Sequence, residues 1–242
     1  MVSKSDIKFI RSLALKKYRD ENSVFVAEGE KIVEEAIKSS YKIEALYYKD
    51  EIGEDAMSKI SLLSTPSPAL AIVKMKEYGD TNEIDFSKLY FALDSVRDPG
   101  NLGTIIRISD WFGIDTIFAS EDTVELYNPK VVQATMGSIF RVDVRYLSIP
   151  VMLSHVKNRI PIYGTFLSAP SIYESKLTRN GIIILGSESH GISKELEDLS
   201  DYKVLIPQYP KESKESESLN VAVSAAILAA EFRRPSVVQL QK

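Results

Sequence analysis

The segment DPGNLGTIIRISDWFGID, residues 98–115, places one amide and one guanidinium where an apolar strand would turn into a helix. Asn101 stands at the mouth of the turn, and Arg107 is the single cation among the isoleucines that follow. A guanidinium can position an anionic substrate and stabilise negative charge that develops on an oxygen. Both residues also have structural alternatives, because Asn101 suits a helix N-cap and Arg107 a solvated helix face.

Two further turns carry small and polar residues directly after apolar runs. In IIILGSESHGIS, Gly186 and Glu188 follow a run typical of a buried strand. Between VLIP and VAVSAAILAAEF, Ser218 and Asn220 precede an apolar helix. Ligands of parallel α/β sheets bind beyond the carboxyl ends of the strands, so three such turns together favour one shared site. Taken singly, Gly186 could serve a positive φ angle and Ser218 a helix cap.

The composition excludes several other chemistries. The 242 residues include no cysteine and two histidines, which excludes disulfides and a cysteine nucleophile, and we expect no metal site. The glycine spacing matches neither the dinucleotide-binding fingerprint nor the phosphate-binding loop of nucleotide hydrolases, and no esterase elbow is present. We find no signal peptide and no membrane-spanning segment, and we expect a cytoplasmic protein.

Hydrophobic periodicity indicates the elements that must position these turns. Residues 1–80 predict a small α/β unit, with one helix from about residue 4 to residue 20, strands at 24–29, 42–48 and within 62–75, and a helix at 30–40. Residues 76–87 are polar and predict a linker. Apolar runs then alternate with helical segments through residues 86–242, which predicts a parallel sheet covered on both faces. Strands are expected at 89–94, 115–119, 140–146, 161–166, 181–186 and 203–206, and helices at 101–112, 128–136, 149–158, 193–199 and 219–232.

Basic residues gather at the N-terminus although the net charge of the chain is −4. Residues 1–20 include Lys4, Lys8, Arg11, Lys16, Lys17 and Arg19 against Asp6 and Asp20. Such a stripe can bind nucleic-acid phosphates even on an acidic protein, and the alternative is a solvated helix face.

The three turns together resemble the signature motifs of the SpoU (TrmH-type) RNA ribose 2′-O-methyltransferases of the SPOUT superfamily. NLGTIIRISDWFG is similar to the first motif, LGSESHGIS to the second, IP…SLNVAVSAAILAAEF to the third, and NPKVVQATMGSIFRV, residues 128–142, to the conserved segment between them. Through FVAEGEKIVEEAI, the N-terminal unit resembles the substrate domain of members that act on large ribosomal RNA. The resemblance implies a deep trefoil knot in residues 86–242, preceded by an RNA-binding domain in residues 1–80. It also implies S-adenosylmethionine as methyl donor, RNA as substrate and a homodimer through the knot face.

The resemblance also assigns expected roles to individual residues. Arg107 matches the catalytic arginine and Asn101 the asparagine of the same motif, and Glu188 is expected to orient one of them. The remaining assignments are Ser218 and Asn220 for shaping the donor and ribose pocket, Gly186, Ile206 and Leu219 for donor binding, and Arg107 for an RNA contact. The basic stripe adds Lys16 and Lys17 as expected RNA contacts.

Two departures from the family pattern bear on substrate binding. The stretch QYPKESKESE, residues 208–217, replaces a short glycine-containing turn and predicts either a lid that contacts RNA or a solvated insertion. Gln133 stands where an arginine is common, which predicts one weaker phosphate contact. The expected activity is 2′-O-methylation of large-subunit ribosomal RNA. Alternatives are a transfer-RNA methyltransferase and an inactive RNA-binding assembly protein; the full set of polar motif residues argues against the latter.

Overall fold

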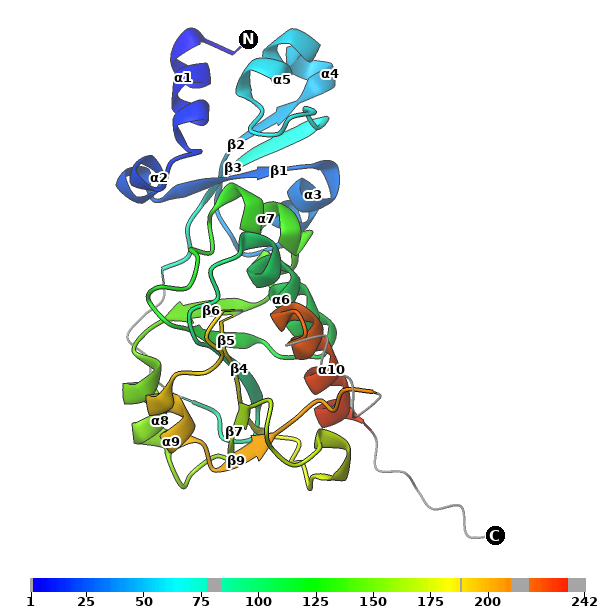
Figure 1. Cartoon of the computed structure of the whole chain (residues 1–242). Coiled ribbons are helices and arrows are strands. Elements are labelled where there is room, and N and C mark those ends of the chain that lie inside the picture. The colour runs from blue at the N-terminus through cyan, green and yellow to red at the C-terminus, as the bar shows by residue number, and fades with distance from the viewer. Residues whose placement is uncertain (1, 78–83, 188, 210–217, 235–242) are drawn as a thin grey trace. The chain divides into compact units, whose positions relative to one another are not determined.

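The computed structural model describes residues 2–77, 84–187, 189–209 and 218–234, and most of its elements are labelled in Figure 1. The chain forms two compact units, each assembled from separate stretches of sequence. Unit 1 combines residues 1–82, 97–107 and 124–143, and unit 2 combines residues 83–96, 108–123 and 144–242. Residues 78–83, in the middle of the predicted linker, lie outside the described residues.

Unit 1 contains a three-stranded antiparallel sheet in the order β1-β3-β2. Its strands are β1 (Val24–Glu28), β2 (Ile43–Tyr48) and β3 (Ala69–Lys74), and all five residues of β1 are buried. The helices of this N-terminal part are α1 (Lys4–Ser12), α2 (Lys16–Asn22), α3 (Glu30–Lys38), α4 (Lys49–Ile52) and α5 (Glu54–Ile60). One core cluster joins α1, α5 and the sheet through Ile10, Leu13, Val24, Val26, Met57, Ile60, Leu70 and Ile72.

The single helix predicted from residue 4 to residue 20 is wrong, because the chain breaks between α1 and α2. Leu15 has an extended backbone, with φ −99° and ψ 133°. The break lets Leu13 enter the core while Arg19, one turn into α2, is also buried. Helices α4 and α5 were not expected, because the stretch from Lys49 to Ile60 is short and rich in charge.

Unit 1 also takes in helix α7 (Pro129–Thr135) and the 3-10 turn η1 (Ser138–Phe140). Helix α7 packs on strand β1. The strand predicted from residue 140 therefore begins only at residue 143, because residues 138–140 form a turn that buries Ile139 and Phe140.

Unit 2 is built on a six-stranded sheet in the order β6-β5-β4-β8-β7-β9. The strands are β4 (Leu89–Leu93), β5 (Thr116–Ala119), β6 (Asp143–Tyr146), β7 (Ile162–Thr165), β8 (Gly181–Leu185) and β9 (Tyr202–Val204). The pairs β4–β5, β4–β8, β7–β8 and β7–β9 are parallel. The predicted α/β class with a parallel sheet is confirmed.

Helices cover both faces of this sheet, as Figure 1 shows. Helices α8 (Ile149–Val156) and α9 (Lys194–Leu199) share a core with Ile162 and Ile184 on one face. Helix α10 (Val221–Arg233) lies on the other face, where Phe232 meets the ring of Tyr163 edge-on at 4.8 Å between centroids. Neighbouring side chains of a strand point to opposite faces of the sheet. Ile162 therefore packs on the α8 and α9 side, and Tyr163 packs on the α10 side. No helix within the described residues is long and apolar enough to cross a bilayer.

Candidate active site

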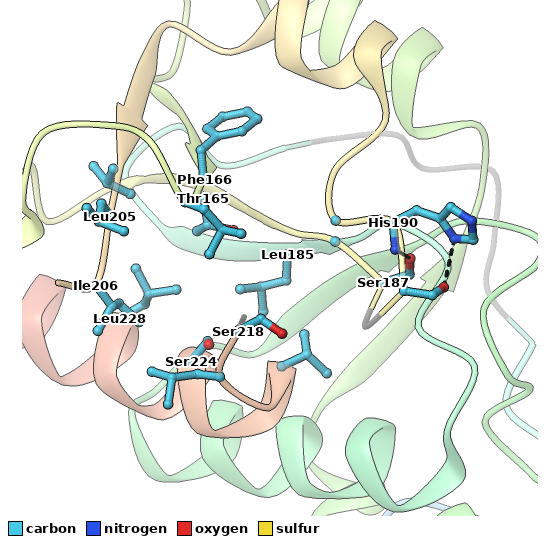
Figure 2. Close-up of a pocket in the computed structure, with 17 residues that line it drawn as sticks. Thr165, Phe166, Leu185, Ser187, His190, Leu205, Ile206, Ser218, Ser224 and Leu228 are labelled. Carbon is cyan, nitrogen blue, oxygen red and sulfur yellow. Dashed lines mark hydrogen bonds between the residues drawn. The ribbon is translucent and has the colours of Figure 1, made fainter. Parts of the chain in front are cut away.

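A cavity of about 360 Å³ opens in unit 2 where strands β7, β8 and β9 end. Four stretches line it, residues 165–167, 185–191, 204–206 and 218–228. Figure 2 shows Thr165, Leu185, Ile206 and Ser218, which come from all four stretches, around the same space. The volume lies in the range of small-molecule sites, and the position is the one expected for a ligand of a parallel sheet.

The wall after β8 is a tight turn that requires glycine at its first position. A Cβ on Gly186 would lie 2.1 Å from the carbonyl carbon of Gly191. The turn closes through hydrogen bonds from the Ser187 amide to the Gly191 carbonyl at 3.1 Å and back at 3.0 Å. Gly191, with φ +69°, supplies the positive φ angle that had been the structural alternative for Gly186. Gly186 is therefore required for close backbone approach.

The loop that carries this turn is anchored to the end of strand β4. The Asp94 amide donates to the Leu185 carbonyl at 2.8 Å. The Asp94 carboxylate accepts from the Ser193 amide at 2.7 Å. Both ends of the loop are thus fixed to one residue.

The opposite wall is formed by the chain that continues from β7 and β9. The Phe166 amide donates to the Val204 carbonyl at 3.0 Å, and the Leu205 amide donates to the Pro170 carbonyl at 2.9 Å. This pairing presents Leu205 and Ile206 to the cavity. Backbone hydrogen bonds therefore hold the two stretches of this wall together.

The start of helix α10 provides the third wall. Asn220 caps the helix, since its side-chain oxygen accepts from the amides of Ala222 at 2.9 Å and Val223 at 3.2 Å. The alternative that Ser218 is the cap is wrong, and Ser218 and Leu219 instead line the cavity. A substrate-shaping role for Asn220 stays a prediction beside this capping role.

The cavity has a nearly neutral lining. Its apolar side chains include Leu185, Leu205, Ile206, Leu219 and Leu228, and its hydroxyls belong to Thr165, Ser187, Ser189, Ser218 and Ser224. Among the described lining residues, His190 alone is ionisable. His190 is exposed and bonded through Nδ1 to the Ser189 hydroxyl at 2.7 Å, and Figure 2 shows its ring directed away from Leu185 and Ser218.

A second cavity of about 920 Å³ adjoins the first. The two share Leu167, Leu205, Ile206, Ser218 and Leu219, and the second extends past Pro170 and Glu174 to Tyr209. The shared residues form a common wall between the two cavities.

Helix α6 (Pro99–Trp111) carries the first predicted motif. The Asp98 carboxylate accepts from the Asn101 amide at 2.8 Å, so Asp98 caps the helix and the N-cap alternative for Asn101 is wrong. Asn101 is half-buried in the first turn, and Arg107 is exposed. Both belong to unit 1. Arg107 forms no hydrogen bond or ion pair with any residue that the structure describes.

The predicted basic stripe is smaller than its sequence suggests. Arg19 is buried, donates to the Leu13 carbonyl at 2.7 Å and pairs with Glu125. Lys16 and Lys17 are exposed at the start of α2, but they pair with Asp20 at 2.5 Å and Glu21 at 3.8 Å. Their predicted RNA contacts would have to compete with these ion pairs.

The structure gathers part of the predicted site. Gly186, Ile206, Ser218 and Leu219 line one cavity, whereas Glu188 and residues 210–217 lie outside the described residues. Sequence reasoning missed Thr165, Phe166, Ser187, Ser224 and Leu228. The spacing of Ser224 and Leu228 at four-residue steps from Asn220 could have indicated one helix face, and FLSAPS after β7 is a further strand-end turn.

Comparisons with known proteins agree with this arrangement. The SpoU rRNA methylase family model matches residues 88–230, and the MRM3-like substrate binding domain model matches residues 4–69. The chain is 31% identical to the 23S rRNA (guanosine(2553)-2′-O)-methyltransferase RlmP of Bacillus subtilis, over 94% of this chain and 95% of that protein.

Two solved structures share the fold along nearly the whole chain. A TrmH-family protein from Porphyromonas gingivalis has a TM-score of 0.87 and 35% identity, covering 98% of this chain and all of that one. The AdoMet-bound rRNA methyltransferase from Sinorhizobium meliloti has a TM-score of 0.85 and 28% identity, covering 96% of each chain. The family predicted from the three motifs is confirmed: the chain belongs to the SpoU rRNA methylase family.

Proposed function

We propose that this protein is an S-adenosylmethionine-dependent RNA ribose 2′-O-methyltransferase that acts on large-subunit ribosomal RNA. The observation that carries the proposal is the cavity of unit 2, where the second and third family motifs meet beyond three parallel strands. Family membership and the AdoMet-bound relative support the same activity.

The cavity fits the proposed donor. S-adenosylmethionine combines an adenosine, a sulfonium cation and an amino-acid tail. The described lining holds no lysine or arginine that would repel the sulfonium, and it offers leucine side chains beside hydroxyls and backbone groups. At Gly186 the missing Cβ allows two backbone stretches to meet, which keeps the wall compact. We assign donor binding to Gly186, Ile206 and Leu219, with Ser218 beside them.

When bound, the donor supplies an electrophilic methyl group. We assign to Arg107 the positioning of the target ribose and the stabilisation of negative charge on its 2′-oxygen. A guanidinium keeps its proton in proteins, so a charge-stabilising role suits it better than proton abstraction. Arg107 is exposed and has no partner among the described residues, which leaves its donors available. We assign Asn101, in the same helix, to the same catalytic group, Glu188 to orienting Asn101 or Arg107, and Ser218 with Asn220 to shaping the donor and ribose pocket.

Ribosomal RNA is the substrate that the comparisons favour over transfer RNA. The similarity to RlmP, whose name specifies 23S rRNA, extends through the N-terminal part of the chain. That part also matches a substrate binding domain model. We therefore assign RNA capture to residues 1–80, including Lys16 and Lys17, and methyl transfer to residues 86–242.

The proposal extends to the trefoil knot, a homodimer through the knot face and a cytoplasmic location. Exposed apolar side chains in unit 2 support the homodimer, since Trp111 is 84% and Val223 48% exposed in the single chain. Large exposed apolar groups of this kind commonly mark association surfaces. Light scattering should give twice the chain mass, and a monomer at micromolar concentration would contradict the dimer.

Calorimetry with S-adenosylmethionine, followed by methyl transfer from labelled donor to 23S rRNA and to bulk tRNA, tests the activity. We expect donor binding and label in the ribosomal RNA alone. Binding of RNA without binding of donor would instead identify an RNA-binding assembly protein, and label in tRNA alone would identify the transfer-RNA alternative.

A further inference from the structure

Helix α7 is joined to the N-terminal sheet by one side-chain amide. The Gln133 Nε2 group donates to the Glu28 carbonyl oxygen at 2.6 Å. Glu28 is the last residue of β1, and 1% of it is exposed. The amide of Gln133, which is half-buried, is therefore engaged within the protein rather than directed to an RNA phosphate.

Glu28 is a rigid point of attachment. Its carboxylate accepts from the Ser61 hydroxyl at 2.5 Å, the Leu62 amide at 2.9 Å and the Ser67 amide at 3.3 Å. Its backbone pairs with Leu70 of β3. Glu28 is held by the sheet through its backbone and by a loop through its carboxylate, so its carbonyl is a fixed partner for Gln133.

The other side of α7 meets helix α6 without space for a side chain. A Cβ on Gly103 would lie 2.4 Å from the Ala134 Cβ and 2.9 Å from the Val131 carbonyl oxygen. Arg107 follows Gly103 by four residues, and residues at that spacing share one face of a helix. A displacement of α7 would therefore be transmitted to the part of α6 that carries Arg107.

The chain around α7, residues 124–143, is the bridge segment of unit 1. It is held to the N-terminal sheet and to α3 at several further points. The ring of Phe25 in β1 lies tilted against Tyr127 at 4.6 Å and stacked with Phe140 at 6.3 Å between ring centroids. Arg141 pairs with Glu35 of α3. These contacts fix the position of the bridge segment on the N-terminal sheet, and Gln133 supplies the hydrogen bond from helix α7 itself.

We propose that Gln133 is a positioning residue for methyl transfer, which fixes helix α6, and thereby Arg107, relative to the N-terminal sheet. The inference rests on the proposed function, in which the N-terminal part captures RNA and Arg107 meets the target ribose. Small misplacements of a catalytic group are costly, since about 1 Å can reduce turnover by two orders of magnitude. Gln133 acts through Arg107 and needs no contact with RNA.

Gln133→Met removes the N–H group that bonds to the Glu28 carbonyl, while the side chain keeps its length. We expect its kcat with 23S rRNA to fall about tenfold, with the KM for RNA and the Kd for donor changed less than about twofold. Gln133→Arg restores a hydrogen-bonding N–H group at this position and should recover at least about half of the wild-type kcat. Lys130→Met, on the exposed side of the same helix, is the matched control and should behave as wild type.

The outcomes separate this inference from the proposed function. A Gln133→Met protein with unchanged kcat, or with a raised KM for RNA at unchanged kcat, would overturn the positioning role. An equal loss in Gln133→Arg would also overturn it, because the hydrogen bond would then not be the cause. If wild type bound donor and methylated RNA while these variants behaved identically, the inference would fail and the proposed function would stand.

A spectroscopic measurement covers the case in which activity is too low to compare. The chain has no cysteine, so Lys31→Cys in α3 and Thr104→Cys in α6 introduce two unique, exposed labelling positions. Electron spin resonance on the labelled full chain should give one narrow distance distribution, broadened by Gln133→Met and narrow again with Gln133→Arg. Equal widths in all three proteins would overturn the proposal.

Discussion

The bridge segment of unit 1 and the cavity of unit 2 are built on different principles. Side chains hold the bridge segment, through the Gln133 amide, the Arg141–Glu35 and Arg19–Glu125 ion pairs and packed aromatic rings. Backbone hydrogen bonds and glycine shape the cavity, and its lining is nearly neutral. The difference teaches that paired charges and stacked rings serve orientation in unit 1, whereas a neutral lining shaped by the backbone suits a ligand in unit 2.

Arg107 gives the largest expected effect. Arg107→Ala should lower kcat at least about a hundredfold, because the charge developing on the 2′-oxygen loses its partner, while the donor Kd stays the same. Thr104→Ala, at an exposed position of the same helix, is the control. Near-normal turnover in single-turnover assays of Arg107→Ala would remove the arginine from the mechanism.

Gly186 tests the claim that backbone shape makes the cavity. Gly186→Ala forces its Cβ against the Gly191 backbone, so the turn must shift. Donor affinity measured by calorimetry should fall about thirtyfold, with RNA affinity unchanged, because shape complementarity in the pocket is lost. Ser189→Ala, in the same loop, should cost less than threefold by comparison, roughly the worth of one exposed hydrogen bond. Equal donor affinity in Gly186→Ala would contradict the backbone account.

Glu28 tests the polar construction of unit 1. Glu28→Ala leaves the buried Ser61 hydroxyl and the Leu62 amide without their acceptor, at a cost of about 2 kcal/mol in the free energy of unfolding. Urea unfolding should show this loss, and calorimetry should show unchanged donor binding in the folded protein. Glu30→Ala, exposed at the start of α3, is the control. If Glu28→Ala lowered the affinity for S-adenosylmethionine without lowering the free energy of unfolding, Glu28 would serve the cavity and not the construction of unit 1.

Reversal of Lys16 and Lys17 to Glu has the smallest expected effect. Each lysine already pairs with an acidic residue on α2, so the RNA affinity should fall only about three- to tenfold, with a shallower salt dependence. Donor binding should be unchanged. Filter binding at several salt concentrations measures the RNA affinity, and the control is the variant with Lys38→Glu and Lys42→Glu. Identical RNA affinity would exclude α2 from the RNA contact.

The sequence predicted the parallel sheet well, because its four inner strands, β5, β4, β8 and β7, are mostly buried apolar runs. The strand predicted at 181–186 is β8, Gly181–Leu185, and the helix predicted at 219–232 is α10, Val221–Arg233. The failures lie where tertiary contacts override local pattern. Leu15 is extended so that Leu13 and Arg19 can both be buried.

The candidate site was predictable where backbone geometry demands a residue type. Gly186 has no tolerable substitute in its turn, and that demand is visible in the motif. The capping alternatives named Asn101 and Ser218, but Asp98 and Asn220, which are also good caps at neighbouring positions, take these roles. The partnership of Gln133 with Glu28 joins residues too far apart in sequence for local periodicity to connect them.

Mapping of ribose methylation in ribosomal and transfer RNA, from cells with and without the gene, tests the central claim most directly. Without the gene, one 2′-O-methyl group should disappear from large-subunit ribosomal RNA, and wild type but not Arg107→Ala should restore it. An unchanged ribosomal RNA map, or a methyl group lost from transfer RNA instead, would contradict the account.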